Sequence, residues 1–261
     1  MKNCLIMGFG RSGTSLMGGI LHQAGYYMGE DLYPPRHSNP KGFFENAFIN
    51  GINERILSNY DFSVSHNQIP VFDKPHSPYN PGTGQRWLTY IPKEIDVNII
   101  DKISENEIKQ ATSVKGYAYK DPRFNYTLGL WNKYTDTDTI YICVFRQPEI
   151  VVESVITECK TTEYLSNFYI DKNIAFRLWY NSYANLLNNQ TIVDRVIFIH
   201  YEQLLSGDAL MKLSNKLGVK IDSGFVDPKL NRSKSLSKIP INVYKLYSKL
   251  SKLAGYKKNY K

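Results

Sequence analysis

Cysteine is scarce in this sequence, and its scarcity excludes one class of architecture. The 261 residues contain three cysteines, Cys4, Cys143 and Cys159. Three cysteines do not make a disulfide framework, and two of them lie in or beside apolar runs, so we expect reduced thiols in a hydrophobic core. Such thiols suit a reducing compartment.

Long apolar runs are missing as well. No stretch approaches the ~20 apolar residues that a transmembrane helix needs. The sequence begins MKNCLIMGFG, in which one lysine precedes an apolar run that is too short for a signal peptide with a cleavage site. We therefore expect a soluble, cytoplasmic protein.

An excess of positive charge is missing from most of the chain, although the total is basic. The 32 lysines and arginines outnumber 24 aspartates and glutamates, for a net charge of +8. Ten basic residues and no acidic residue lie in 228–261, so 22 basic and 24 acidic residues remain elsewhere, a net charge of −2. This slightly acidic remainder of the chain does not favour nucleic acid as a partner. Attraction to a membrane or a polyanion would come from the last segment.

Four short apolar runs are typical of buried parallel strands. They are rich in β-branched and aromatic residues and occupy 2–9, 116–120, 139–145 and 195–201. Apolar residues at helical spacing predict helices over 14–24, 148–158, 172–187 and 202–217. This alternation predicts a single α/β domain with a central, mostly parallel sheet and helices on both faces. Active sites of such sheets lie beyond the carboxyl ends of the strands.

Two segments depart from this alternation. Residues from about 60 to 95 are rich in proline and have no clean period, which predicts an irregular insertion in a domain of residues 1–237. Residues 238–261 form a basic tail, in which apolar residues and lysines fall on separate faces of a predicted helix. The tail either makes peripheral contact with a membrane or an anionic acceptor, or packs on the body with a solvated lysine face. The second interpretation is favoured because such faces are common.

The stretch GFGRSGTS, residues 8–15, has the spacing of a phosphate-binding P-loop but lacks its lysine, because Thr14 stands at that position. Glycines allow a tight turn whose N–H groups point inward, and the following helix presents its positive end. The loop can therefore hold an anion without the lysine. Arg11 adds charge, and Ser12, Thr14 and Ser15 add hydroxyl groups. The strand before and the helix after favour anion binding over an ordinary turn.

This loop resembles the 5′-phosphosulfate loop of sulfotransferases, which transfer sulfuryl groups from 3′-phosphoadenosine 5′-phosphosulfate (PAPS). In that family a basic residue precedes Ser-Gly-Thr, as Arg11 precedes Ser12, Gly13 and Thr14 here. The resemblance implies that Arg11 assists departure of the bridging phosphate oxygen. It also implies that the loop amides and the hydroxyls of Thr14 and Ser15 hold the 5′-phosphate. A donor with a sulfuryl group has no β,γ-phosphate pair to clamp, which accounts for the missing lysine.

A second match to the family follows the third predicted strand. Arg146 ends this strand and Ser154 lies eight residues later on the next predicted helix, as do the residues that grip the donor's 3′-phosphate in sulfotransferases. Arginine offers a fork for phosphate oxygens, and serine offers one more donor. The strand end at Tyr201 resembles a Tyr-Glu-Asp element whose tyrosine lies near the adenine. Near the end of the chain, FVDPKLNRSK resembles a late basic segment of the family, which makes Arg232 a candidate contact of the nucleotide phosphate.

The block KDPR, from Lys120 to Arg123, also resembles bacterial sulfotransferases. There this strand end faces the donor site, so Lys120 and Arg123 are further candidate anion contacts. The other interpretation of the block is a strand end followed by a turn.

Transfer to an alcohol needs a base that accepts the hydroxyl proton, and histidine and glutamate are the usual choices. The run Asn-Pro-Lys-Gly-Phe-Phe-Glu resembles a bacterial branch with a recurring glutamate. Glu45 is therefore favoured as the base, and His37 is the alternative. Glu30 and Asp31 fit a polar turn better. The histidines show no ligand spacing, and we assign no metal.

Together these motifs predict a sulfotransferase that moves a sulfuryl group from PAPS to a hydroxyl of a carbohydrate, a glycolipid or a small metabolite. Two other functions stay open. A P-loop small-molecule kinase would need a lysine at position 14 and a magnesium-binding aspartate, for which Asp121 is the convenient candidate. A protein without catalytic activity would bind a glycan or a membrane through the basic tail.

Overall fold

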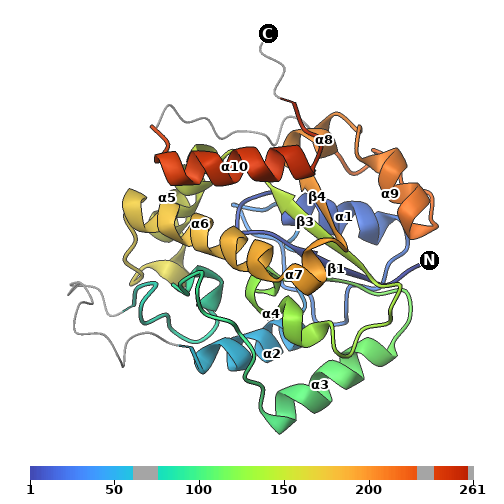
Figure 1. The fold of residues 1–261 in the computed structure, drawn as a ribbon, viewed down its shortest axis with the longest axis horizontal. Coiled ribbons are helices and arrows are strands. Elements are labelled where there is room, and N and C mark those ends of the chain that lie inside the picture. The colour runs from blue at the N-terminus through green and yellow to red at the C-terminus, as the bar shows by residue number, and fades with distance from the viewer. Residues whose placement is uncertain (61–75, 228–237, 258–261) are drawn as a thin grey trace.

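Four parallel strands form the centre of the molecule (Figure 1). The computed structural model describes residues 1–60, 76–227 and 238–257. The strands are short and mostly buried: β1 (Cys4–Met7), β2 (Ala118–Lys120), β3 (Ile140–Phe145) and β4 (Val196–His200). Their order is β2-β1-β3-β4, and every neighbouring pair is parallel. The predicted α/β class and parallel sheet are confirmed.

Both faces of the sheet are covered by helices. Along β1, Leu5 and Met7 belong to the larger apolar core, and Cys4 and Ile6 belong to the smaller one. The larger core is built with α2 (Ala47–Ser58), α3 (Lys102–Ser113), α4 (Phe124–Trp131), α5 (Pro148–Thr161), α6 (Lys172–Asn188) and α10 (Ile241–Leu253). The smaller core is built with α1 (Thr14–Gln23), α8 (Tyr201–Leu205) and α9 (Leu210–Leu217). A sheet buried on two faces requires strands that are apolar throughout, such as CLIM and IYICVF.

Side chains just before the helices fix where several of them begin. Asn46, Asp101 and Asp171 precede α2, α3 and α6, and each side chain accepts a hydrogen bond from a backbone amide three residues later. Helix α5 begins at Pro148, whose missing N–H costs nothing in the first turn. The predicted helices over 14–24, 148–158 and 172–187 correspond to α1, α5 and α6, and are confirmed.

The single helix predicted over 202–217 is wrong, because two helices occupy this range. Helix α8 ends at Leu205 and α9 begins at Leu210. Between them Gly207 has a φ of 83°, in the left-handed region that ends a helix. The Ser206 hydroxyl donates to the Asp208 carboxylate at 2.6 Å, which closes the turn.

The insertion and the tail both contact the body. In the described part of the insertion, 76–95, a short 3-10 helix η2 (Arg86–Leu88) brings the fully buried Leu88 into the larger core. Helix α10 lies along α6 and next to α5 (Figure 1), and its Val243 and Leu250 are buried. In the described parts of the chain, no helix has both the length and the apolar character to cross a membrane.

Candidate active site

The carboxyl ends of the four strands bring several of the predicted site residues to one edge of the sheet. The Gly-rich loop, residues 8–15, follows β1, and Lys120 is the last residue of β2. Arg146 directly follows β3, and Tyr201 directly follows β4. Because the strands are parallel neighbours, residues that are distant in the sequence meet at this edge.

Gly8 and Gly13 in the loop combine a positive φ with a close neighbour, so these positions accommodate only glycine. Gly8 has a φ of 142°, and a Cβ there would lie 2.1 Å from the backbone oxygen of Val144. Gly13 has a φ of 97° and directly precedes α1, and a Cβ there would lie 2.3 Å from the Tyr201 ring. Arg11 also has a left-handed φ, 69°, which is unusual for a residue with a side chain. The loop backbone thus packs against Val144 and Tyr201 and leads to the N-terminal, positive end of α1.

The loop hydroxyls point to different places. Thr14 and Ser15 line the cavities described below, and Nζ of Lys120 donates to the Ser15 hydroxyl at 3.4 Å. Ser12 is fully buried, and its hydroxyl accepts a hydrogen bond from Tyr183 at 3.0 Å. Thr14 and Ser15 are therefore the hydroxyl groups that the loop offers to a ligand, whereas that of Ser12 faces the core.

A larger cavity, with a volume of about 620 Å³, lies between the loop and α5. Gly13, Arg146, Ser154 and Tyr201 line it together. The guanidinium carbon of Arg146 lies 4.4 Å from the centre of the Tyr201 ring, a cation–π contact. Burial lowers the pKa of Arg146, but the neighbouring Tyr201 opposes this shift. A cation, a hydroxyl group and an aromatic ring thus face one space.

A smaller cavity, with a volume of about 250 Å³, also adjoins the loop and is lined by Glu45. One carboxylate oxygen of Glu45 is paired with Lys120, and the other accepts from Nδ2 of Asn50 at 2.9 Å. Burial alone would raise the pKa of this carboxyl, but Lys120, Arg123 and the hydrogen bonds outweigh burial and lower it. Four aromatic residues also line the cavity: Tyr33, Phe43, Trp87 and Tyr164.

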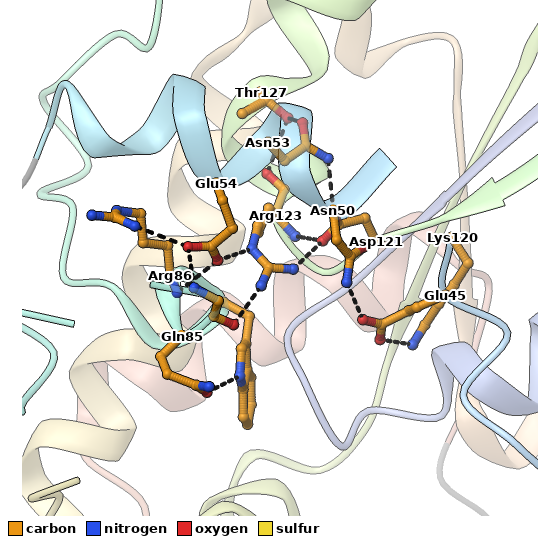
Figure 2. A network of polar contacts seen from close by, with 12 residues as sticks. Glu45, Asn50, Asn53, Glu54, Gln85, Arg86, Lys120, Asp121, Arg123 and Thr127 are labelled. Carbon is orange, nitrogen blue, oxygen red and sulfur yellow. Dashed lines mark hydrogen bonds and ion pairs between the residues drawn. The ribbon is translucent and has the colours of Figure 1, made fainter. Parts of the chain in front are cut away.

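Behind Glu45 lies a buried polar network with Arg123 at its centre (Figure 2). Arg123 donates from Nε to Glu54 at 2.6 Å, from Nη1 to Asp121 at 2.9 Å and from Nη2 to the Gly84 carbonyl at 2.9 Å. Glu54 also binds Arg86 at 3.0 Å, which ties the insertion to the network. Burial raises the pKa of Asp121, although Arg123 counteracts it. The network extends through Asn53 to Thr127 and Trp131.

Arg11 lies where the two cavities meet. Its Nε donates to the Ser154 hydroxyl at 3.1 Å, and its Nη2 donates to the Ser38 carbonyl at 3.1 Å. Its Nη1 is 3.7 Å from Oε2 of Glu158. Residues that line both cavities are Arg11, Thr14, Ser15 and Glu158. A group bound at the loop would therefore face both spaces at once.

Comparisons with known proteins identify the family of this chain. The model of the sulfotransferase family matches residues 4–212. This chain belongs to the sulfotransferase family. Among solved structures, a sulfotransferase domain from the curacin biosynthetic pathway is similar, with a TM-score of 0.51 and 15% identity over 98% of both chains. Sulfotransferase STF1 of Mycobacterium tuberculosis H37Rv has a TM-score of 0.43 and 15% identity over 96% of this chain and 76% of that chain. No curated protein matches.

Two residues of this sulfotransferase site had no motif to mark them. Glu158 lies on α5 four residues after Ser154, so helical spacing from Ser154 was the available signal. Trp87 comes from the insertion and lies against Gly10, where a Cβ would be 2.4 Å from its ring. Its indole N–H donates to Gln85 at 3.2 Å. No pattern in the insertion indicates this contact.

The remaining predicted residues lie apart from the centre of the site or outside the described chain. His37 is exposed and lines the larger cavity, whereas Glu45 lines the smaller one. Arg232 lies outside the described residues. Asp121 is fully buried and bound by Arg123 and by Nδ2 of Asn53 at 2.9 Å. Within 1–60, 76–227 and 238–257, no group of three or more His, Cys, Asp or Glu side chains could hold a metal ion.

Proposed function

We propose that this sulfotransferase uses PAPS and transfers its sulfuryl group to a hydroxyl of a carbohydrate, a glycolipid or a small metabolite. The observation that carries the proposal is the pair of cavities that meet at Arg11, Thr14 and Ser15. One space offers cationic and hydroxyl groups, and the other contains an ionised carboxylate. A donor and an acceptor can thus reach the loop from two sides.

The larger cavity fits the chemistry of PAPS. Arg146 and Ser154 would hold the 3′-phosphate, and Tyr201 offers a flat ring to the adenine. Thr14, Ser15 and the first amides of α1 would hold the 5′-phosphate, since a helix N-terminus favours an anion. The close packing of Gly13 against Tyr201 joins these two parts of the site.

Glu45 is the proposed base. PAPS supplies an activated sulfuryl group: the acceptor oxygen bonds to sulfur, the bond from sulfur to the bridging oxygen breaks, and its electron pair stays on the phosphate. Glu45 accepts the acceptor's proton, and Arg11 compensates the charge that develops on the bridging oxygen. His37 is the alternative base, but it lines the other cavity.

Lys120 would control the strength of this base. A carboxylate with a lowered pKa is a weak base. Lys120 lies between Glu45 and Ser15, so an anion held at Ser15 would compete with Glu45 for the ammonium group. Loss of this cation would raise the pKa of Glu45 and make it a stronger base when the donor is bound.

The kinase alternative has less support. Thr14 replaces the lysine that would grip a nucleotide's β- and γ-phosphates. Asp121, the candidate magnesium ligand, accepts hydrogen bonds from Arg123 and Asn53 instead. Tight binding of ATP with Mg²⁺, measured by calorimetry, would favour the kinase alternative.

We further propose peripheral contact of α10 with an anionic membrane. Lys245, Lys249 and Lys252 are exposed on this helix, and Ile241 and Tyr244 are exposed beside them. Such a mixture of lysines and apolar side chains suits a lipid surface. Co-sedimentation with phosphatidylserine vesicles, compared with phosphatidylcholine vesicles, tests this contact. A variant with glutamate at the three lysines should not sediment.

Calorimetric titration tests the donor. The desulfated product, 3′-phosphoadenosine 5′-phosphate (PAP), should bind without metal and much more tightly than ADP. Arg146→Ala should weaken its binding, whereas Arg55→Ala, at a partly exposed residue on α2 and outside both cavities, should not. Tight binding of ATP with Mg²⁺, and none of PAP, would overturn the proposal.

A further inference from the structure

Glu158 is a buried carboxylate that the proposed transfer does not use. Its side chain is 3% exposed, yet it lines both cavities. Oε1 accepts hydrogen bonds from the Ser38 hydroxyl at 2.9 Å and from the Tyr164 hydroxyl at 3.1 Å. Oε1 is therefore well occupied and is held by two residues from different segments.

The other oxygen of Glu158 is in a different situation. Oε2 faces Nη1 of Arg11 at 3.7 Å, which is longer than a hydrogen bond. The hydrogen bonds of Arg11 go to Ser154 and to the Ser38 carbonyl instead. Across the described ranges Oε2 thus accepts no hydrogen bond, although a carboxylate oxygen has two lone pairs. A buried carboxylate with spare capacity favours a ligand that brings a donor.

The smaller cavity has the dimensions and walls for a single ring. Its volume of about 250 Å³ lies below the range of cavities that hold drug-sized ligands, about 300–1,000 Å³. Tyr33 and Tyr164 on its wall are 41% and 37% exposed, which leaves aromatic surface for a ligand to cover. The same space contains the carboxylates of Glu45 and Glu158.

We propose that Glu158 is a specificity residue that accepts a hydrogen bond from a second hydroxyl of the acceptor, which is a polyhydroxylated ring. This inference rests on the proposed transfer at the same site. Glu45 takes the proton of the attacking hydroxyl, and Oε2 of Glu158 binds a neighbouring hydroxyl that keeps its proton. The aromatic walls cover the apolar faces of the ring.

An acceptor with a single hydroxyl would bind less well for a physical reason. It would cover Oε2 of Glu158 without supplying a donor, and a desolvated carboxylate without a donor is costly. A site that is built to bind a substrate hydroxyl rejects an analogue that lacks it far more strongly than an apolar site rejects a missing methylene. Selectivity should therefore depend on Glu158 and not only on the size of the cavity.

The test measures sulfuryl transfer from radiolabelled PAPS, catalysed by the full chain, to two kinds of ring acceptor of similar size. One is a panel of methyl hexopyranosides, and the other is cyclohexylmethanol, which has one hydroxyl. We expect kcat/KM to favour the best glycoside by at least about 100-fold, and Glu158→Gln to reduce this preference by about 10- to 100-fold, mainly through KM. Activity with cyclohexylmethanol should rise, because a neutral amide costs less to cover than a carboxylate. Glu163→Gln, an exposed glutamate outside both cavities, is the matched control and should keep the preference.

The outcomes separate this inference from the proposed function. If PAP does not bind, the proposed function fails. If PAP binds but cyclohexylmethanol is sulfated as well as the glycosides, or Glu158→Gln leaves the preference unchanged, this inference is wrong and the donor site stands. The same holds if saturation-transfer NMR with PAP present detects no glycoside on the protein and none is sulfated.

Discussion

The two carboxylates of the smaller cavity are held in different ways. Glu45 is paired with Lys120 and lies beside a network centred on Arg123. Glu158 is held at one oxygen by two hydroxyl groups, and its cation, Arg11, is 3.7 Å away. Charge fixes the first carboxylate in its ionised form, whereas the second retains hydrogen-bonding capacity. The first therefore suits proton transfer, and the second suits recognition.

The largest expected difference between the two is in turnover. Glu45→Gln should lower kcat by about 10²- to 10⁴-fold, because the amide cannot accept the proton. PAP affinity, measured by calorimetry, should not fall, because Lys120 is then free to pair with the bound anion. Glu158→Gln should instead act mainly on the KM for the acceptor. Equal losses of kcat in both variants would break the distinction, and a loss in His37→Ala with none in Glu45→Gln would transfer the role of base to His37.

Loss of an arginine should destabilise the protein more in the network beside Glu45 than beside Glu158. Arg123→Met removes the cation that the buried Asp121 and Glu54 share, so we expect a loss of about 3–5 kcal/mol in the free energy of unfolding. The matched Arg11→Met should cost no more than ~1 kcal/mol, because Arg11 is partly exposed and its ion pair is long. Urea unfolding with both variants measures the difference, and similar losses would contradict it.

The pH profile of the reaction should respond to the loss of Lys120 but not to the loss of the Glu158 charge. The pKa of Glu45 lies below its usual 4.5 in the protein without donor, so the acid limb of kcat/KM for PAPS, which reports the free enzyme, should lie below that pH. In Lys120→Met burial is less opposed, the pKa rises, and the limb should move to higher pH. Glu158→Gln should leave the position of the limb unchanged. An unmoved limb in Lys120→Met would show that another group titrates.

The smallest expected effect is on the hydrogen bonds to Glu158. Tyr164→Phe removes one of the two donors to Oε1, so the free energy of unfolding should fall by about 0.5–1.5 kcal/mol. Tyr244→Phe, on an exposed residue of α10, is the control and should have no effect. Thermal unfolding of both variants measures the difference. No loss in Tyr164→Phe would mean that Ser38 alone positions this carboxylate.

Much of the sheet and its edge could be predicted because the signals are local. Each strand is a continuous apolar run, and Arg146 and Tyr201 directly follow two of these runs. The same reasoning failed between α8 and α9, where the periodicity of the apolar residues continued across Ser206, Gly207 and Asp208. The Ser-Gly pair was a turn signal, but the prediction gave more weight to periodicity.

The sequence by itself determined the fold class, the Gly-rich loop after β1 and the residues that follow β3 and β4. Local apolar patterns specify parallel strands, and the carboxyl ends of such strands lie at one edge of the sheet. Only the tertiary structure decided which groups meet across the loop: Lys120 with Glu45, 75 residues away, and Arg11 with Ser154, 143 residues away. These contacts depend on how distant segments pack, and no local period encodes that packing. The smaller cavity as a whole was therefore not predictable, because it is assembled from the insertion, α5 and the segment before α2.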